Sequence, residues 1–447
     1  MTRHSLFIPA LLFSLSVYGQ ADGLSLQECI ALSRANNPDV VNAGLDARAA
    51  KAQKQETMGL WFPTVAFSAY GFHALNPLVR IGIEDVLGSG DGANNLRYYL
   101  ETMAGLNGIN TEWTTLGKGY LAGLTLSQPV FAGGRIANGN ALAALGVKAA
   151  EVKKNIAVRD NDDAVIRKYW LVVSLNEKMS ALRQALELLH SLEKDAVNAS
   201  EAGVVTGNDV LKVKLKAKEL ESQMVQLRSG ERLAKMDLLN TVGYEYKVMK
   251  LDSVKLSDGF GELYAPEHYQ MDGAGASRSR EESELLAMSV EAKKLEKKMA
   301  VGESLPQIGV GASLGYGQVI GNPRPNGAVF AMVKIPLSDW GKSSRKIQRC
   351  QYEIEKAENQ KAFLDRQLQL KQDKEWVDLQ TAWDKVQLSK DAVEIAEMEE
   401  RQKRDEYCVG MCTLSELLQC QTSLQAARSA LVDSEAEYCN AVAVWQR

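Results

Sequence analysis

The sequence LSQPVFAGGR at residues 126–135 has a counterpart later in the chain, IPLSDWGK at residues 335–342, at an offset of 207 residues. Each stretch leads from an apolar run into a long segment without proline. Each long segment ends in a glycine turn, EAGVVTGNDVL at residues 201–211 and YCVGMCTLSELL at residues 407–418. Because a repeat sets the architecture of a whole chain, the sequence predicts two copies of one unit.

The two copies align without gaps from the end of the apolar run to the glycine turn. Five of the matching pairs are Pro129 and Pro336, Gly134 and Gly341, Gly203 and Gly410, Thr206 and Thr413, and Asp209 and Glu416. Upstream, ARAAKAQKQETMGLWFPTV at residues 47–65 matches VEAKKLEKKMAVGESLPQI at residues 290–308 with an offset of 243. The first copy is therefore longer between Pro63 and Pro129, where GSGDG at residues 88–92 and Asn94-Asn95 predict an exposed, mobile loop.

The proline-free segments predict very long helices. Apolar residues recur at helical spacing between Gly134 and Gly203, and one helix over these ~68 residues would be ~100 Å long. A second helix runs back after each turn, which predicts antiparallel helical hairpins over about residues 135–239 and 342–445. Gly203 and Gly410 suit the left-handed position that ends a helix, and T-x-x-D/E after each glycine suits the start of the next helix.

Four other segments have the character of strands, about residues 63–73, 119–130, 306–317 and 327–337. The third has one apolar face, whereas its other face consists of glycine and serine. About ten residues is the length that a tilted strand needs to cross a bilayer. Four strands cannot close a barrel, and lipid does not tolerate an open sheet edge, so closure requires several chains.

Aromatic residues gather at the same end of each strand pair, as they do at a membrane interface: Trp61, Phe62, Phe131 and Trp340. They favour a membrane sheet over the alternative, an ordinary soluble sheet.

The amino terminus and the overall charge bear on location and partners. Residues 1–20 hold a basic start, an apolar run and a small polar end, which is typical of a cleaved signal peptide. No later stretch is long and charge-free enough to predict a helical membrane anchor. With 52 basic and 56 acidic residues, the net charge of −4 gives no indication of a nucleic-acid partner.

The sequence contains none of the common motifs of a catalytic or metal-binding site. Its mature part holds three dispersed histidines, His73, His190 and His268, without H-E-x-x-H, G-x-S-x-G or a phosphate-binding glycine loop. We therefore expect no enzyme, no cofactor and no metal site, and a hydrolase or metalloenzyme is the least favoured class. Most of the six cysteines are expected to be small buried residues. Cys408 and Cys412 flank Gly410, and either a disulfide or two unpaired thiols fits that spacing.

The motifs together resemble the TolC-type outer-membrane efflux proteins, through LSLQECIALSRANNPDV at residues 24–40, LSQPVFAGGR and the paired G-x-x-T-x-x-D/E turns. The resemblance implies a mainly helical homotrimer. Each chain would give four strands to a twelve-stranded outer-membrane β-barrel, and the long hairpins would form a periplasmic α-barrel. The chain would divide into a signal peptide (1–20), a first repeat (21–243), an equatorial inter-repeat segment (244–280) and a second repeat (281–447).

The resemblance also implies a function as the exit duct of a tripartite efflux or type I secretion system, which passively exports its substrate. The entrance would lie at Asp209, Tyr407, Glu416 and Gln419, with Gln419 standing where a second acid is expected. A periplasmic adaptor of an inner-membrane pump would dock at the turns, on Gly203, Val204, Val205, Thr206, Gly410, Met411, Cys412 and Thr413.

Two simpler readings stay open. Asp209 and Glu416 also fit a role as helix caps that oppose the helix dipole. The whole chain also fits a periplasmic coiled-coil scaffold whose strands form a soluble hairpin. The sequence does not identify the substrate.

Overall fold

The computed structural model describes residues 23–75, 79–88, 90–108, 112–115, 118–203, 205–243, 255–257, 259–269, 274–318 and 323–446. The predicted signal peptide and Val204 lie outside these residues. The chain forms two compact units. One, here called the helical unit, comprises the described residues of Met1–Ala47, Ala150–Leu285 and Ala362–Arg447, and the other, the strand unit, comprises those of Arg48–Ala149 and Leu286–Lys361.

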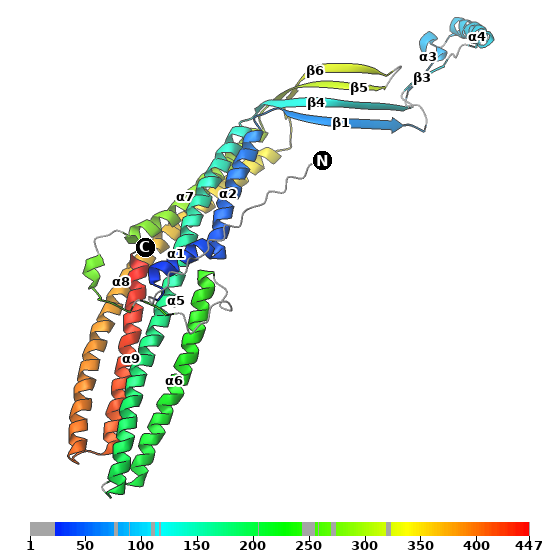
Figure 1. Cartoon of the computed structure of the whole chain (residues 1–447). Helices are drawn as coiled ribbons and strands as arrows, with labels where there is room; N and C mark the ends of the chain where they lie inside the picture. The colour runs from blue at the N-terminus through cyan, green and yellow to red at the C-terminus, as the bar shows by residue number, and fades with distance from the viewer. Residues whose placement is uncertain are drawn as a thin grey trace. The chain divides into compact units, whose positions relative to one another are not determined.

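Long helices dominate the helical unit (Figure 1). It contains α1 (Leu26–Asn36), α6 (Gly207–Val242), a 3-10 turn η2 (Pro266–Tyr269), α9 (Leu414–Trp445) and most of α5 (Arg135–Glu201) and α8 (Lys342–Cys408). The helices α2 (Pro38–Gly59) and α7 (Ala274–Glu303) begin in this unit and continue in the strand unit. As the repeat predicts, α5 and α8 have equal lengths of 67 residues.

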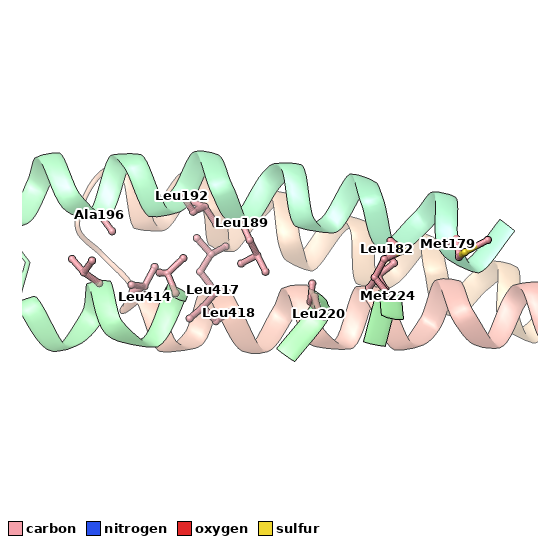
Figure 2. Packing of buried hydrophobic residues seen from close by; sticks show 12 residues of the cluster. Met179, Leu182, Leu189, Leu192, Ala196, Leu220, Met224, Leu414, Leu417 and Leu418 are labelled. Carbon is pink, nitrogen blue, oxygen red and sulfur yellow. The ribbon is translucent and has the colours of Figure 1, made fainter. Parts of the chain in front are cut away.

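Apolar side chains between the hairpins form the core near the turns (Figure 2). Leu182, Leu189 and Leu192 of α5 pack with residues of α6 and with Leu414 and Leu417 of α9. Burying such side chains contributes roughly 1.5–3 kcal/mol each. This cluster therefore holds the start of the second hairpin's returning helix against the first hairpin.

Capping boxes fix where the helices begin. Ser25 accepts a hydrogen bond from the backbone N–H of Glu28, whose carboxylate accepts one from the N–H of Ser25 at 2.9 Å, so α1 starts as the sequence predicts. Asn37 accepts from the N–H of Asp39 at 2.8 Å, which caps α2 ahead of Pro38. Among the described residues, no helix is both long and apolar enough to cross a membrane.

The strand unit holds a four-stranded antiparallel sheet in the order β1 (Thr64–His73), β4 (Lys118–Ala132), β5 (Gln307–Gln318) and β6 (Arg324–Lys334) (Figure 1). The two repeats thus meet inside the chain where β4 pairs with β5. Among the described residues, β1 and β6 are each paired along one side only.

Strand register shows the duplication directly. Thr64 pairs with Ser127 in the first hairpin. Gln307, which lies 243 residues after Thr64, pairs with Lys334, which lies 207 residues after Ser127. The two hairpins therefore have one register, related by the two offsets read from the sequence.

One face of this sheet is apolar across all four strands. The cross-strand rows align Phe67, Leu124 and Leu314, and next to them Val65, Leu126, Ala312 and Val329. Most of these large side chains are exposed. On the opposite face, β5 presents Gln307 and then only small residues, Gly309, Gly311, Ser313, Gly315 and Gly317. Rings of the neighbouring strands lie over two glycines there, Phe330 over Gly311 and Phe72 over Gly119.

Two segments differ from the sequence prediction. The insert of the first repeat is not one loop, because it holds β2 (Val79–Gly82), α3 (Ile83–Leu87), α4 (Asp91–Leu106) and β3 (Glu112–Thr115), and β2 pairs with β3. Asn94 and Asn95 lie inside α4, whose apolar residues recur at helical spacing from Leu96 to Leu106. The fourth strand ends at Lys334, three residues before the predicted end.

Candidate functional site

The predicted site lies at the two turns that join the paired helices of the helical unit. Gly203 and Gly410 both adopt the left-handed conformation, with φ of 76° and 75°. The N–H of Gly410 donates to the carbonyl of Tyr407 at 3.0 Å, and that of Met411 donates to the carbonyl of Glu406 at 2.8 Å. These bonds satisfy the last carbonyl groups of α8, so glycine is what allows each helix to end here.

A carboxylate caps the helix that follows each turn. The carboxylate of Glu416 accepts hydrogen bonds from the N–H of Thr413 at 2.7 Å and from its hydroxyl at 3.0 Å. Asp209 does the same with Thr206, at 3.3 and 2.7 Å. A full capping box therefore follows each turn, at the start of α6 and of α9. Its hydrogen bonds lower the pKa of Glu416 and of Asp209 below their ordinary values.

Asp209 also takes part in a contact between the two hairpins. Its second oxygen lies 3.1 Å from the ammonium nitrogen of Lys212, and the same nitrogen lies 3.0 Å from the hydroxyl oxygen of Ser415. A chain of polar contacts therefore runs from the first turn to the first residues of α9.

The second turn has an ion pair of its own. The ammonium group of Lys403 lies 2.7 Å from the carboxylate of Glu406, which lowers the pKa of Glu406. Glu406 and Glu416 both act on Lys403 and raise its pKa. The carboxylate of Glu416 therefore points into a mixed cluster of charges and not into a purely acidic one.

Tyr407 belongs to the core beneath the turns. Its ring packs against the apolar cluster of α5, α6 and α9. Burial raises the pKa of the Tyr407 phenol, and the carboxylates of Asp209 and Asp195 add to that effect. The structure thus brings Tyr407 and Asp209 together, although they come from different hairpins.

The remaining predicted residues line the surface of the turns. Gly203, Thr206, Gly410, Met411, Thr413 and Gln419 are exposed, whereas Val205 and Cys412 are half-buried. Val204 lies outside the described residues. Met411 is 78% exposed, so the second turn presents a flexible apolar side chain to solvent.

The cysteines of this region are free thiols in the structure. Cys408 is exposed, while Cys412 is half-buried and donates to the carbonyl of Lys403 at 3.2 Å. Burial raises the pKa of the Cys412 thiol. Of the six cysteines, Cys29, Cys420 and Cys439 are buried, which is half of them, whereas the sequence predicts that most are buried.

A cavity of about 750 Å³ lies among α5, α6, α8 and α9, farther from the turns. Leucines line part of it, and the rest is polar: Arg404 pairs with the buried Glu400, and Arg428 pairs with Glu397 at 2.7 Å. The side chain of Gln421 also lines it, and neither of its amide atoms has a hydrogen-bond partner. The four helices are therefore not close-packed at this level.

Sequence reasoning missed Lys212, Ser415, Lys403 and Glu406. Lys212 lies one turn after Asp209 and could have been found from that spacing. Its contact with Ser415 depends on how two hairpins pack, and no local pattern gives that. Within the described residues, no group of three or more His, Cys, Asp or Glu side chains is placed to hold a metal ion.

Comparison with solved structures identifies the fold. The outer membrane protein VceC of Vibrio cholerae is 14% identical, with a TM-score of 0.75 over 94% of each chain. The CmeC outer membrane channel of Campylobacter jejuni is 13% identical, with a TM-score of 0.73 over 97% of this chain and 90% of that one. The open MtrE outer membrane channel of Neisseria gonorrhoeae is 15% identical, with a TM-score of 0.70 over 94% of this chain and 88% of that one.

No protein-family model and no curated protein matches the sequence. The likeness to these solved structures covers 94–97% of this chain. The fold expected from the resemblance to TolC-type outer-membrane efflux proteins is therefore confirmed.

Proposed function

We propose that this chain, which has the fold of outer-membrane channels, is one protomer of a homotrimeric exit duct in a bacterial outer membrane. The observation that carries the proposal is the exposed sheet of the strand unit. Its apolar face is continuous over four strands, and both of its edges lack a partner strand within the described residues.

Lipid is the environment that suits the apolar face. An exposed apolar surface that spans a whole sheet promotes aggregation in water, but it is stable in contact with the lipid chains of a bilayer. The edges require closure, since unpaired backbone groups are too costly in lipid. Identical copies supply the missing edges, and three copies of four strands give a barrel of about twelve.

The helical unit suits the periplasmic part of such a duct. A helix of 67 residues reaches ~100 Å, and paired helices from three chains can enclose a tunnel of that length. In this arrangement the turns form the entrance, with Asp209, Tyr407, Glu416 and Gln419 around it.

The exposed turns suit docking of a periplasmic adaptor that belongs to an inner-membrane pump of a tripartite efflux or type I secretion system. Their apolar tip at Met411, which lies between Gly410 and Cys412, is the centre of the surface we propose for that contact. Opening would separate the two hairpins, and the loosely packed cavity around Gln421 leaves room for such a movement.

Export through the duct is proposed to be passive, without catalysis, cofactor or nucleic-acid partner. The solved structures that the chain resembles are channels. The energy for transport would come from the pump, and the tunnel would only need to be water-filled and wide enough for the substrate.

A matched pair of variants tests the lipid-facing assignment. Leu124 lies on the apolar face, whereas its neighbour Thr125 lies on the opposite face. A charge on the lipid face costs about 2–4 kcal/mol at the bilayer midplane, and one on the lumen side does not carry that cost. We expect Leu124→Arg to abolish channels in planar bilayers and Thr125→Arg to retain them.

Two results would contradict the proposal. If both variants conduct alike, or if the wild-type protein neither enters membranes nor conducts, the sheet is not a membrane sheet. Release of the wild-type chain from cells into buffer without detergent would favour the periplasmic scaffold.

A further inference from the structure

Helix α4 of the insert separates its apolar and polar side chains onto opposite faces. Successive residues of a helix are rotated by about 100°. This rotation gathers five large apolar side chains on one face, Leu96, Tyr99, Leu100, Met103 and Leu106. It places polar side chains on the other face, Asp91, Asn94, Arg97, Glu101 and Thr102. The helix is therefore strongly amphipathic.

The apolar face of α4 is exposed within the described residues. Tyr99 is 63% exposed and Leu106 is 78% exposed. Among the described residues, α4 contacts α3 of the same insert, and no residue of α4 is buried. Because most of the stability of helices in proteins comes from packing of an amphipathic face, this face requires an apolar environment from outside the described chain.

The insert is attached at one defined end of the sheet. It leaves β1 after His73 and returns to β4 at Lys118, and these two residues pair with each other. At the other end of this hairpin, Thr64 pairs with Ser127, and there α2 leads into β1 and β4 leads out to α5. Ten paired residues lie between the two ends, which is the length that crosses a bilayer. If the sheet spans the membrane, the insert emerges at the surface opposite to α2 and α5.

A short length of chain keeps α4 near that surface. Eleven residues, 107–117, connect the end of α4 to the start of β4. Even fully extended, a segment of this length reaches at most ~40 Å. The lipid around the sheet, which contacts the apolar face of β1 and β4 in the proposed function, therefore lies within reach of α4.

The width of the apolar face favours lipid over a second copy of the same helix. With Ala93 and Ala104, the apolar residues cover roughly 160° of the circumference. A seam between paired helices is a narrower stripe, whereas a helix that lies in a membrane surface has a wide apolar face. Tyr99 lies near the edge of this face, and tyrosine is enriched where lipid meets water.

We propose that α4 lies in the surface of the outer membrane, on the side away from α2 and α5, with its apolar face among the lipid chains. Leu96, Leu100 and Met103 are at the centre of that face and insert most deeply. The inference rests on the proposed function, because it requires the sheet to span that membrane. In this position, lipid holds the insert beside the mouth of the duct and out of the exit path.

Apolar contact, and not charge, carries this binding. Arg97 and Glu101 form an ion pair on the polar face, with 2.9 Å between Nε and Oε1. The polar face therefore has little net charge to attract anionic lipid. The position of α4 should depend neither on salt nor on anionic lipid.

Fluorescent labels on single cysteines test this position in the intact protein, reconstituted in bilayers of phosphatidylcholine. The background carries Cys350→Ser, Cys408→Ser and Cys412→Ser, which removes the less buried thiols. Leu96→Cys carries the label on the apolar face. Asn94→Cys is the matched control, because it lies on the polar face of the same helical turn.

Two quenchers report where each label lies, a doxyl-labelled lipid in the bilayer and iodide in water. We expect the lipid to quench the label at Leu96→Cys and iodide to quench the label at Asn94→Cys. The ratio of lipid quenching to iodide quenching should differ between them by about fivefold or more. The ratio at Leu96→Cys should stay the same in about 1 M NaCl, because salt does not screen apolar contacts.

Two results at α4 would overturn the inference. Equal quenching of both labels by iodide would place the helix in water. Protection of the label at Leu96→Cys from both quenchers would show that protein covers the face, as in a bundle of α4 helices from several copies.

A label at Leu124→Cys separates this inference from the proposed function. Leu124 lies on the apolar face of β4, so its label reports whether the sheet is in lipid. Lipid quenching at Leu124→Cys without lipid quenching at Leu96→Cys overturns the position of α4 alone. Absence of lipid quenching at Leu124→Cys overturns the membrane sheet and, with it, the proposed function.

Discussion

The ammonium group of Lys212 lies 3.0 Å from the hydroxyl oxygen of Ser415, and this contact links the two helical hairpins at their turns. Residues separated by 203 positions meet here because the repeat folds its two turns side by side. In the proposed duct, this contact opposes separation of the hairpins.

Removing the contact should therefore ease opening. Lys212→Met or Ser415→Ala loses about 0.5–1 kcal/mol, discounted for exposure, which corresponds to roughly 2–5-fold more frequent opening in planar bilayers. Lys218→Met is the matched control, because Lys218 pairs with Glu221 of its own helix at 2.7 Å. Equal opening in all three variants would show that the contact does not hold the entrance closed.

Glu416 can act as a helix cap, as a charge at the entrance, or as both. Glu416→Gln keeps a side-chain acceptor for Thr413 and removes the charge, whereas Glu416→Ala removes both. A role at the entrance predicts that both variants alter ionic leak and cation selectivity. If selectivity is unchanged in both and only Glu416→Ala loses stability, Glu416 is a cap alone.

Lowering the pH should weaken the hydrogen bonds that hold the two turns in place. The folded state holds the pKa of Asp209 below its ordinary value, through Thr206 and Lys212, so its ionised form stabilises the turn. That contribution is present above the unfolded pKa of roughly 4 and is lost as the pH falls through the folded pKa. Glu416 shifts in the same direction.

We therefore expect opening to become more frequent as the pH falls below about 4, with a smaller increase in Asp209→Asn. Single-channel recording across this range measures it. An opening frequency that falls on acidification would contradict the assignment.

The close approach of Gly133 to Gly302 predicts a difference between two adjacent glycines. Gly134→Ala only forces a left-handed alanine, at about 1–2 kcal/mol, because there is space around its Cβ position. Gly133→Ala adds a collision with backbone atoms and should destabilise the chain by clearly more. Urea unfolding of both variants compares them, and equal losses would mean that the two helix ends are not in contact.

An ion pair that involves a buried carboxylate links helix α1 to helix α5. Asp162 is 3% exposed and accepts from the guanidinium of Arg34 at 3.0 Å through Nε. Because Arg34 is half-exposed, Asp162→Ala should lose about 1–3 kcal/mol in urea unfolding. Asp160→Ala, on the exposed side of the same helix, should change stability by less than about 0.5 kcal/mol. A loss of equal size in both variants would count against the pairing.

The repeat made most of the fold predictable, since an offset of 207 located both turns, both long helices and the capping residues Thr206 and Thr413 at once. Ser25, Thr206 and Thr413 could be identified from three-residue spacing, because a capping box is a local structure.

What the sequence did not predict depends on partners that are distant in the chain. Glycines and asparagines around residues 88–95 indicated a loop, but Leu96, Tyr99, Leu100 and Met103 follow at helical spacing and belong to α4. The fourth strand was predicted to reach Leu337, and it stops at Lys334 because one chain offers its remaining residues no strand to pair with. The contact between Lys212 and Ser415 arises only when two hairpins pack together.

The mass of the detergent-extracted mature protein, determined by light scattering, distinguishes a membrane-bound trimer from a soluble monomer. A sheet with an apolar face and two unpaired edges should stay in the membrane fraction until detergent is added and should then elute as three chains. A single chain that remains in solution in plain buffer would show that the sheet is not part of a trimeric membrane barrel.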